Sequence, residues 1–546
     1  MKKKKLKLLS AALSCICTLS FLFSGCGGNK QTSKMTKAAN TDMITANLGA
    51  EPKTIDPALN NTSEGSTVIY NMFEGLLRIG NDNKPEPGMA EKWEVKDNGK
   101  KYIFHLRDGI KWTDNTPITA KDFKYGILRV LDPATGSPYS YHAYCIKNGK
   151  AYNSKKAKAE DVGVKVIDDK TLEIDLEHSV PYFLDILSWH LLIPLKEDMV
   201  KKNPNTWAND PSTIVSNGPF KLVEWKHNDH MMFEKNPNYW DAANVKLKKL
   251  KLTMMTNNNT ALTAYKTGDL DLITDIPAAQ LPSLLSSGKA KSNAQIGPYM
   301  FCVNVNRKPL NDVRVRKALS LAIDRNALVK TVLRGGEKPA VGFIPYGLSD
   351  GKSGSDFREN GKKYIEAAPN VTEAKKLLAE AGYPDGKGFP SISILYNTSD
   401  IHKSVAESIQ AMWKKNLGIN IKLTNQEWKV FLTTRAEGEY DIARDGYFSD
   451  FFDPGSLFDL WITGSPNNDA KYSNPKYDEL VAQADEEQDT QKRSELYHKA
   501  EDILMNDMPI IPLYYYTQNY MVKSNIKGLH LSPLGWVFFR SVTISQ

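Results

Sequence analysis

Alternating hydrophobic and polar residues predict a hairpin and a helix in the first part of the chain. The runs Trp93–Val95 and Tyr102–Arg107 alternate with a period of two, as half-buried strands do. The turn sequence Asp97-Asn98-Gly99 lies between them and is typical of a hairpin. Thr119 and Asp122 then stand at the capping positions of a helix. The pattern therefore predicts two antiparallel strands followed by a helix.

Helices and strands also mix through the rest of the sequence. Val315, Leu319 and Ile323 recur at helical spacing within residues 311–325. No internal repeat stands out. Further helices are predicted over residues 368–382, 402–416 and much of 472–505, and strands over residues 43–48, 391–395, 419–423 and 537–544.

The stretch from residue 425 to residue 454 carries the most informative chemistry. Its first part, Trp428 to Arg435, is compatible with a helix, and the residues up to Arg444 alternate like a strand. Aromatic residues then surround one acid, Asp450. Two arginines and a carboxylate suit a ligand with both charges, and a free peptide is such a ligand. A solvated surface ion pair is the plain alternative, since such pairs are common and weak.

Length and charge limit the class of protein. The 546 residues exceed what one hydrophobic core usually supports, so at least two lobes are expected. The net charge is +8, but five lysines lie within residues 2–7, and without them 66 basic side chains face 63 acidic ones. The remaining chain is nearly neutral, so no nucleic acid partner is expected.

The first 41 residues predict export and a lipid anchor. Those lysines precede an apolar run, Leu8–Phe23, and then Ser24-Gly25-Cys26, which resembles a bacterial lipobox. The resemblance implies a signal peptide over residues 1–25, lipidation of Cys26 and a polar leash over residues 26–41. A transmembrane anchor is the alternative, although the run is barely long enough to span a bilayer. The predicted location is the outer face of the cytoplasmic membrane.

No metal, cofactor or catalytic site is predicted. Cys145 and Cys302 alone remain after the signal peptide and Cys26, too few for a disulfide framework, and the apolar neighbours of Cys302 predict a buried thiol. The His227–His230 pair sits in a predicted turn with no third ligand nearby. Serine-hydrolase and metalloprotease patterns are absent from the sequence, so an enzyme is not expected.

Two stretches resemble one family. Residues 85–132 contain an A-x-x-W opening, an F-x-L-R-x-G core and a T-A-x-D helix start, similar to the extracellular solute-binding proteins of the peptide and nickel group. Residues 425–454 closely resemble the bacterial oligopeptide-binding proteins, receptors of peptide ABC importers. The resemblance implies an α/β, two-lobed periplasmic-binding-protein fold of class II, with discontinuous lobes joined by a hinge. Its predicted parts are lobe 1 over 42–299, with an extra subdomain near 74–197, lobe 2 over 300–517, and a return to lobe 1 over 518–546.

The same resemblance implies roles for individual residues. Asp450 would hold the peptide ammonium, while Arg435, Arg444 and His402 would serve the peptide carboxylate at different peptide lengths. A solvent-facing position is the alternative for His402. The resemblance and the sequence place the peptide backbone and side-chain pockets at Gly446, Tyr447, Phe448, Trp428, Asn397, Tyr139 and Tyr516.

The sequence departs from the family at two of these positions. The family's best-studied members carry Trp and a disulfide-bonded Cys where this chain has Tyr447 and Phe448. That disulfide cannot form here, and the shape of the nearby pockets is expected to differ.

The implied function is that of a lipid-anchored, monomeric receptor for short peptides with free termini, largely independent of their sequence. It would deliver them to ABC permease subunits with cytoplasmic ATPases. The alternative is a protein of the same fold dedicated to a signalling peptide, a dipeptide, a nickel chelate or an oligosaccharide.

Overall fold

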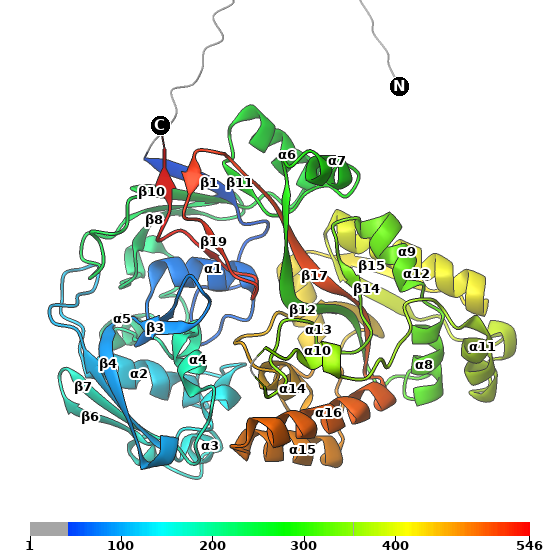
Figure 1. Cartoon of the computed structure of the whole chain (residues 1–546), viewed down its shortest axis with the longest axis horizontal. Coiled ribbons are helices and arrows are strands. Elements are labelled where there is room, and N and C mark those ends of the chain that lie inside the picture. Colours follow the sequence, from blue (N-terminus) through cyan, green and yellow to red (C-terminus); the bar gives the residue numbers. More distant parts are fainter. Residues whose placement is uncertain (1–41, 353, 546) are drawn as a thin grey trace, which may run out of the picture. The chain divides into compact units, whose positions relative to one another are not determined.

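An eleven-stranded mixed sheet runs through the part of the chain that the computed structural model describes, residues 42–352 and 354–545 (Figure 1). The predicted signal peptide, Cys26 and the leash lie outside these residues. In sheet order the strands are β15 (Lys422–Gln426), β14 (Ser393–Asn397), β16 (Ile442–Gly446), β12 (Lys291–Val303), β17 (Ile510–Val522), β11 (Leu272–Ile273), β1 (Met43–Asn47), β10 (Lys249–Thr253), β9 (His230–Lys235) and β8 (Phe220–Lys226), and β13 (Lys338–Pro339) pairs with β17.

Two long strands, β12 and β17, connect the two halves of this sheet. They pair with each other in antiparallel fashion along most of their length, with register shifts between Ala294 and Pro298 and between Tyr299 and Met300. We use "lobe 1" for residues 42–299 with 518–545 and "lobe 2" for residues 300–517, the boundaries predicted from the sequence. The two strands therefore carry the chain from one lobe to the other and back.

Lobe 1 contains a second, four-stranded antiparallel sheet whose first hairpin was predicted. Strands Ala90–Lys96 and Lys101–Leu106 flank the Asp97–Gly99 turn. Thr119 and Asp122 form the capping box of the next helix, as their spacing indicated. The remaining elements of this lobe are β2 (Leu77–Ile79), β3 (Pro85–Pro87), β4 (Ala90–Lys96), β5 (Lys101–Leu106), β7 (Thr171–Asp175), β6 (Val164–Asp168), α1 (Ser63–Met72), α2 (Ala120–Leu131), α3 (Gly149–Asn153), α4 (Phe183–Ser188), α5 (Glu197–Lys202), α6 (Asn258–Thr267) and α7 (Leu281–Ser286).

Lobe 2 is covered by helices, most of which were predicted from the sequence. The strand predicted at 419–423 begins three residues later, at Lys422. The helices are α8 (Val313–Leu321), α9 (Arg325–Ala327), α10 (Phe357–Asn360), α11 (Val371–Glu380), α12 (Asp400–Leu417), α13 (Trp428–Glu437), α14 (Gly455–Phe458), α15 (Pro475–Glu486) and α16 (Thr490–Asp507).

The strands predicted over residues 537–544 are present as two short strands with an interruption between them. Only Val537–Phe538 (β20) and Thr543–Ile544 (β21) are extended, and they pair separately with His530–Leu531 (β19) and Ile526–Lys527 (β18). Asn71 of α1 explains the interruption. Its side chain donates to the Val537 carbonyl at 2.8 Å and accepts from the Phe539 amide at 2.9 Å, so it replaces a strand as the partner of this backbone.

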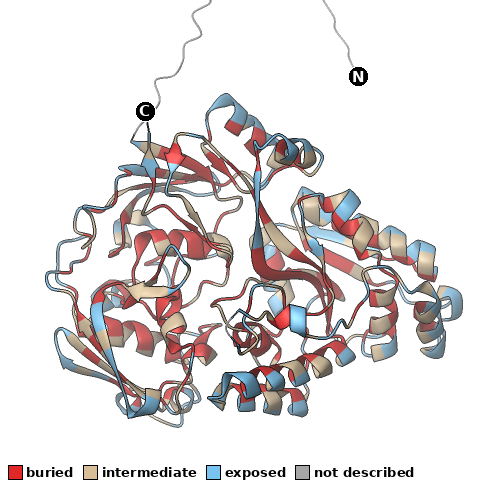
Figure 2. Ribbon diagram, viewed as in Figure 1, coloured by how far each residue is buried: buried red, intermediate tan, exposed pale blue. Residues whose placement is uncertain are grey.

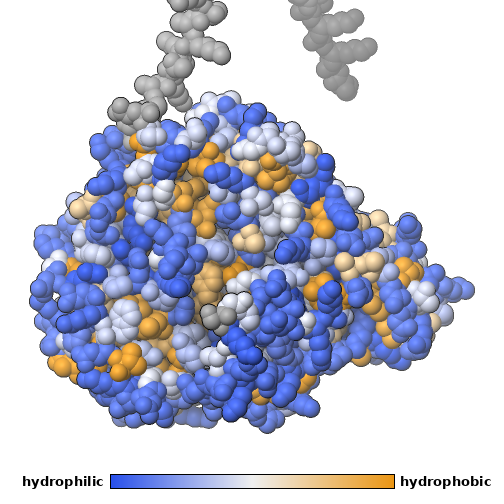
Figure 3. Space-filling model, in the orientation of Figure 1, coloured by the Kyte–Doolittle hydropathy of each residue, from blue (hydrophilic) through white to orange (hydrophobic). Residues whose placement is uncertain are grey.

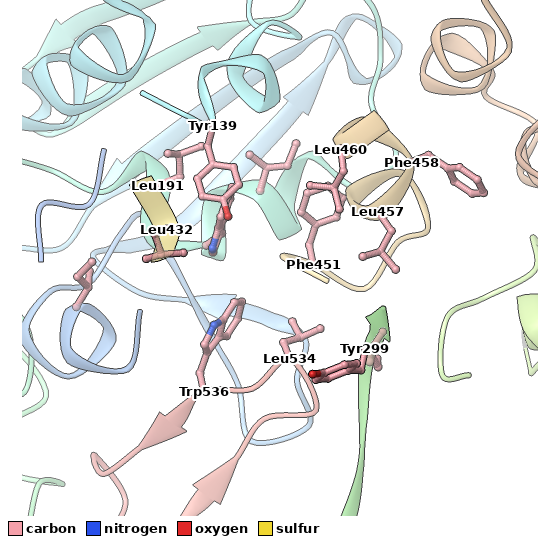
Figure 4. Close-up of a cluster of buried hydrophobic side chains, with 14 of the residues drawn as sticks. Tyr139, Leu191, Tyr299, Leu432, Phe451, Leu457, Phe458, Leu460, Leu534 and Trp536 are labelled. Carbon is pink, nitrogen blue, oxygen red and sulfur yellow. The ribbon is translucent and has the colours of Figure 1, made fainter. Parts of the chain in front are cut away.

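Buried side chains line the interior of both lobes (Figure 2). One large cluster includes side chains from lobe 1, lobe 2 and the return segment, and Figure 4 shows ten of its members with labels. Hydrophilic residues cover most of the face seen in Figure 3. Cys302 is fully buried and not disulfide-bonded, which confirms the buried thiol. Among the described residues, none of the helices has the length and apolar character needed to cross a bilayer.

Candidate ligand-binding site

A cavity of about 650 Å³ lies between residues of lobe 1 and residues of lobe 2. This volume falls within the range of roughly 300–1,000 Å³ typical of sites for small ligands. All eleven ligand-binding residues predicted from the sequence line it, although they come from five separate parts of the chain. They are Tyr139, Asn397, His402, Trp428, Arg435, Arg444, Gly446, Tyr447, Phe448, Asp450 and Tyr516.

Asp450 forms a buried acidic point in the cavity wall. Its carboxylate accepts a hydrogen bond from the Tyr447 hydroxyl at 2.7 Å, and Nε2 of the buried His142 lies 3.7 Å away. Desolvation raises the pKa of the Asp450 carboxyl, although these neighbours and Ser456 act against it. In the described chain no Arg or Lys pairs with Asp450. The site therefore offers a buried carboxylate that an ammonium group could complete.

Tyr447 also connects the two lobes directly. Its hydroxyl, which donates to Asp450, lies 2.8 Å from the hydroxyl of Tyr139 from lobe 1 and can accept a hydrogen bond from it. Tyr139 packs edge-on against Trp189, with 4.8 Å between the ring centroids. These contacts close the cavity beside Asp450.

Arg444 stands on β16, and within the described residues its guanidinium contacts two tyrosines. Its Nη2 donates to the Tyr516 hydroxyl at 3.0 Å, and its guanidinium carbon lies 5.2 Å from the centre of the Tyr299 ring. The Nε atom is buried and donates to nothing in the described chain. Since no described carboxylate forms an ion pair with it, Arg444 is a cation ready to receive an anionic ligand group.

Arg435, at the end of α13, has a different environment. Its Nε donates to Asp469 at 2.7 Å and its Nη1 donates to Asp445. Both carboxylates are buried, and their charges raise the pKa of the Arg435 guanidinium against the opposing effect of desolvation. Arg435 lines the cavity, but its charge is already neutralised within the protein.

His402, in the first turn of α12, lies beside Arg444. Its Nδ1 is 3.3 Å from the Tyr299 hydroxyl, and burial with the nearby guanidinium lowers the pKa of the imidazole well below its ordinary value. The ring is therefore neutral near pH 7 and can act as a hydrogen-bond partner rather than as a second cation. It faces the cavity and not open solvent, so the solvent-facing alternative is wrong.

Within the described residues, the backbone after β16 leaves the amide of Phe448 without a hydrogen bond along the cavity. Tyr447 and Ser449 donate their amides to carbonyls of the β12 region, Pro298 at 3.3 Å and Ile296 at 2.9 Å. Successive residues of an extended chain direct their amides to opposite sides, and no described group accepts from the Phe448 amide. This edge could therefore pair with the backbone of an extended ligand.

Two close approaches shape this edge. A Cβ on Gly446 would lie 2.2 Å from the Tyr516 hydroxyl, so only glycine leaves room for the ring that holds Arg444. The Phe448 ring lies against Gly297 and Gly535, where added Cβ atoms would come within 2.6 Å and 2.9 Å of it. Phe448 thus fills a space made by two glycines.

Several polar atoms of the wall have no partner among the described residues. Burying such atoms unpaired costs free energy, so their concentration in one cavity indicates a polar ligand. They are Asn397 Oδ1, Trp428 Nε1, Arg444 Nε, Asn61 Oδ1, Asn519 Oδ1, Glu64 Oε2, Trp189 Nε1 and His190 Nδ1.

Sequence reasoning missed two acids and two rings of the site. Glu64 and Asp275 line the cavity from lobe 1, Trp536 lines it from the return segment, and His142 supports Asp450 from behind. An acid in the first turn of a helix has an ordinary capping explanation, so Glu64 gave no signal. The others lie in loops or short elements whose spatial neighbours are distant in sequence.

The fold and the cavity define a two-lobed solute-binding protein. The chain belongs to the bacterial extracellular solute-binding proteins, family 5, whose sequence model ("family 5 Middle") matches residues 84–469. The oligopeptide-binding protein OppA of Bacillus subtilis (strain 168) is 38% identical over 531 residues, 95% of each chain. The Haemophilus influenzae OppA complex with RPPGFSPFR has a TM-score of 0.86 at 33% identity and covers 93% of this chain and 99% of that one. The family is one of binding proteins, not enzymes.

A third relative shows which arrangement of the lobes this structure has. The Escherichia coli murein tripeptide binding protein MppA gives a TM-score of 0.87, whereas the unliganded open form of MppA gives 0.63. Both comparisons have 32% identity and cover 93% of this chain, 99% and 98% of the other. The lower score against the open form indicates that the lobes are closed here. The Tyr139–Tyr447 bond and the 3.3 Å ion pair between Glu51 and Lys429 across the cavity agree.

Proposed function

We propose that this protein is a monomeric, lipid-anchored receptor that holds short peptides with free termini between its lobes and passes them to an ABC importer. The peptide ammonium would bind Asp450, and the carboxylate would bind Arg444 with His402 beside it. Arg435 would contribute mainly as a rigid wall, with contact to the carboxylate only at particular peptide lengths. The peptide backbone would pair along residues 446–448.

One observation carries this proposal. Asp450 and Arg444 are buried side chains of opposite charge in a single cavity; in the described chain no Lys or Arg pairs with Asp450, beside which only His142 lies, and no carboxylate pairs with Arg444. A peptide with free termini supplies both missing charges and also strand-forming backbone. Neither a sugar nor a neutral lipid supplies any of these. Side chains would face a cavity with room for water, and this would permit many peptide sequences.

The rest of the proposal concerns location and delivery. Lipidation of Cys26 would hold the receptor at the outer face of the cytoplasmic membrane, with residues 26–41 as a tether. The closed lobes would present one surface to the permease subunits, and ATP would be hydrolysed by other subunits in the cytoplasm. Palmitate labelling of the wild type, lost in Cys26→Ser, tests the anchor.

Native mass spectrometry of residues 42–546 purified from cells tests the ligand. We expect a series of co-purified masses that fit di- to pentapeptides and that are lost in Asp450→Asn. A single discrete species would instead support the alternative of a dedicated signalling peptide. A protein that is empty and does not bind peptides in calorimetry would contradict the proposal and favour chelates or oligosaccharides.

N-terminal acetylation of a tight-binding peptide gives a second test. Acetylation removes the ammonium and leaves the Asp450 carboxylate buried and unpaired, which should cost about 3–5 kcal/mol of binding free energy. Isothermal titration with the free and acetylated peptide measures this difference. Equal affinities would show that Asp450 does not hold the terminus.

A further inference from the structure

Glu64 and Asp275 form a pair of acids in the cavity that the protein itself leaves without a cation. Glu64 stands in the first turn of α1, and its Oε2 is buried without a hydrogen bond from any described residue. Asp275 follows β11 and keeps an exposed side chain, yet the surrounding protein desolvates it enough to raise the pKa of its carboxyl. Because Asp275 lines the cavity, its exposed surface faces the ligand space.

Apart from Asp450, two further acids of the cavity wall, Glu51 and Glu337, are satisfied by the protein. Glu51 is paired with His227 at 2.6 Å and with Lys429 at 3.3 Å. Glu337 accepts from the Gly335 amide at 2.8 Å and from Thr517 at 3.3 Å. In the described chain, no basic group lies within ion-pair distance of Glu64 or Asp275. Neither acid is therefore neutralised by a basic side chain of the described protein, although Glu64 also has hydrogen bonds at the start of α1.

Both acids line the wall of one cavity and have no cation of the described protein beside them, and this points to a cationic group of the ligand. Asp275 adds to the burial of Glu64 in raising the pKa of the Glu64 carboxyl to about 7, so the two charges act on each other. The charge of Arg444, on lobe 2, acts on Glu64 in the opposite direction. The acids of lobe 1 and the arginine of lobe 2 line the same cavity. A cation there would relieve the repulsion between the acids without displacing a group from Arg444.

We propose that Glu64 and Asp275 form a subsite for a basic side chain, Lys or Arg, of the peptide residue held opposite Arg444. The inference rests on the proposed function and narrows it. Affinity would be broad at other positions and would favour a cation at this one. A peptide whose carboxyl-terminal residue is Lys or Arg would use both charges at once, with its carboxylate on Arg444 and its side chain between the acids.

A positional scan tests the subsite. Alanine peptides of three, four and five residues carry lysine, norleucine or glutamate at one position in turn, and calorimetry gives Kd for each. Norleucine has the apolar length of lysine without its charge. We expect one position in each length where lysine binds about tenfold more tightly than norleucine, and glutamate more weakly than both. In a Glu64→Gln/Asp275→Asn protein the preference for lysine over norleucine should fall to less than about twofold.

Controls separate the possible failures. Glu495→Gln neutralises an exposed acid of α16 outside the cavity and should leave the scan unchanged. Thermal unfolding of each variant without peptide shows whether it is folded. If alanine peptides bind but lysine brings no advantage, or the advantage survives in the double variant, the subsite is wrong and the peptide receptor stands. If no peptide binds to the wild type, both proposals fail. Cadaverine binding as tightly as the best lysine peptide would overturn the assignment to a peptide side chain.

Discussion

Arg435 and Arg444 are nine residues apart in the sequence and line the same cavity, yet they differ in almost every respect that matters for binding. Asp445 and Asp469 neutralise Arg435 and fix its guanidinium. Arg444 has two tyrosines as neighbours and an unused buried Nε. A charge contributes to recognition to the extent that the protein leaves it unpaired, so the first arginine is mainly structural and the second is available to the ligand.

Arg435→Met should give the largest effect, and it should appear in stability. The substitution leaves two buried carboxylates without their cation, which should lower the free energy of unfolding by about 3–5 kcal/mol. Chemical denaturation followed by circular dichroism measures the loss. An unchanged midpoint would show that Asp445 and Asp469 do not depend on Arg435, and the contrast between the arginines would be lost.

Arg444→Met should weaken peptide binding and leave stability almost unchanged, the opposite of what is expected for Arg435→Met. Stability without ligand should change by less than about 1 kcal/mol, because no described ion pair is broken. Peptide binding should weaken by about 2–4 kcal/mol, as expected when one partner of a buried charge pair is removed. Calorimetry with one tight-binding peptide and unfolding without peptide test the two halves separately. A loss of stability equal to that of Arg435→Met would make the two arginines equivalent.

Gly446→Ala tests whether Tyr516 must hold Arg444 in place for peptide binding. The added methyl group overlaps the Tyr516 hydroxyl, which must move and release its bond to Arg444. We expect a loss of about 1–3 kcal/mol in peptide binding. Gly446→Ala in a Tyr516→Phe protein is the matched comparison, because the clashing oxygen is absent there. The methyl group should then cost less than it does in the wild type.

The pH dependence of binding gives the smallest effect and concerns the other end of the cavity. Desolvation raises the pKa of the Asp450 carboxyl in the free protein, and an ammonium ligand binds its ionised form. Binding thus lowers this pKa and releases a proton in acid. Affinity should be lost as pH falls through the raised pKa, above the ordinary value of about 3.9, by at most tenfold per pH unit.

An all-alanine peptide isolates this titration from that of Glu64. Calorimetry in two buffers of different ionisation enthalpy measures the proton released. The Asp450→Asn protein should bind weakly and show no such slope, and an identical slope in both proteins would assign the titration to another group.

The sequence was informative where a pattern is local. The helix from Trp428 and the strand to Gly446 have their own periodicity, and Thr119 with Asp122 carries its own cap. The resemblance placed His402 and Tyr516 in the cavity wall without any structural information. Tyr514 and Tyr516 both line the cavity from one face of β17, while Tyr515 donates from the other face to the Gly342 carbonyl.

What the sequence could not reveal depends on partners that are far apart along the chain. The ion pair of Arg435 with Asp469 spans 34 residues, and the hydroxyl bond of Tyr447 with Tyr139 spans 308. Asn71 interrupts the final strand from a distance of 466 residues. Such contacts are decided by the packing of the lobes, and no local pattern encodes them.

The contact of Trp189 with Tyr139 should make the fluorescence of Trp189 sensitive to the opening and closing of the lobes. The indole is almost fully buried and packs edge-on against a ring whose hydroxyl bonds across the cleft. Separation of the lobes would break that bond and free the tyrosine, which would change the surroundings of the indole. Its emission should then shift when the cleft opens or closes, so ligand arrival could be followed in stopped-flow fluorescence without attaching a dye.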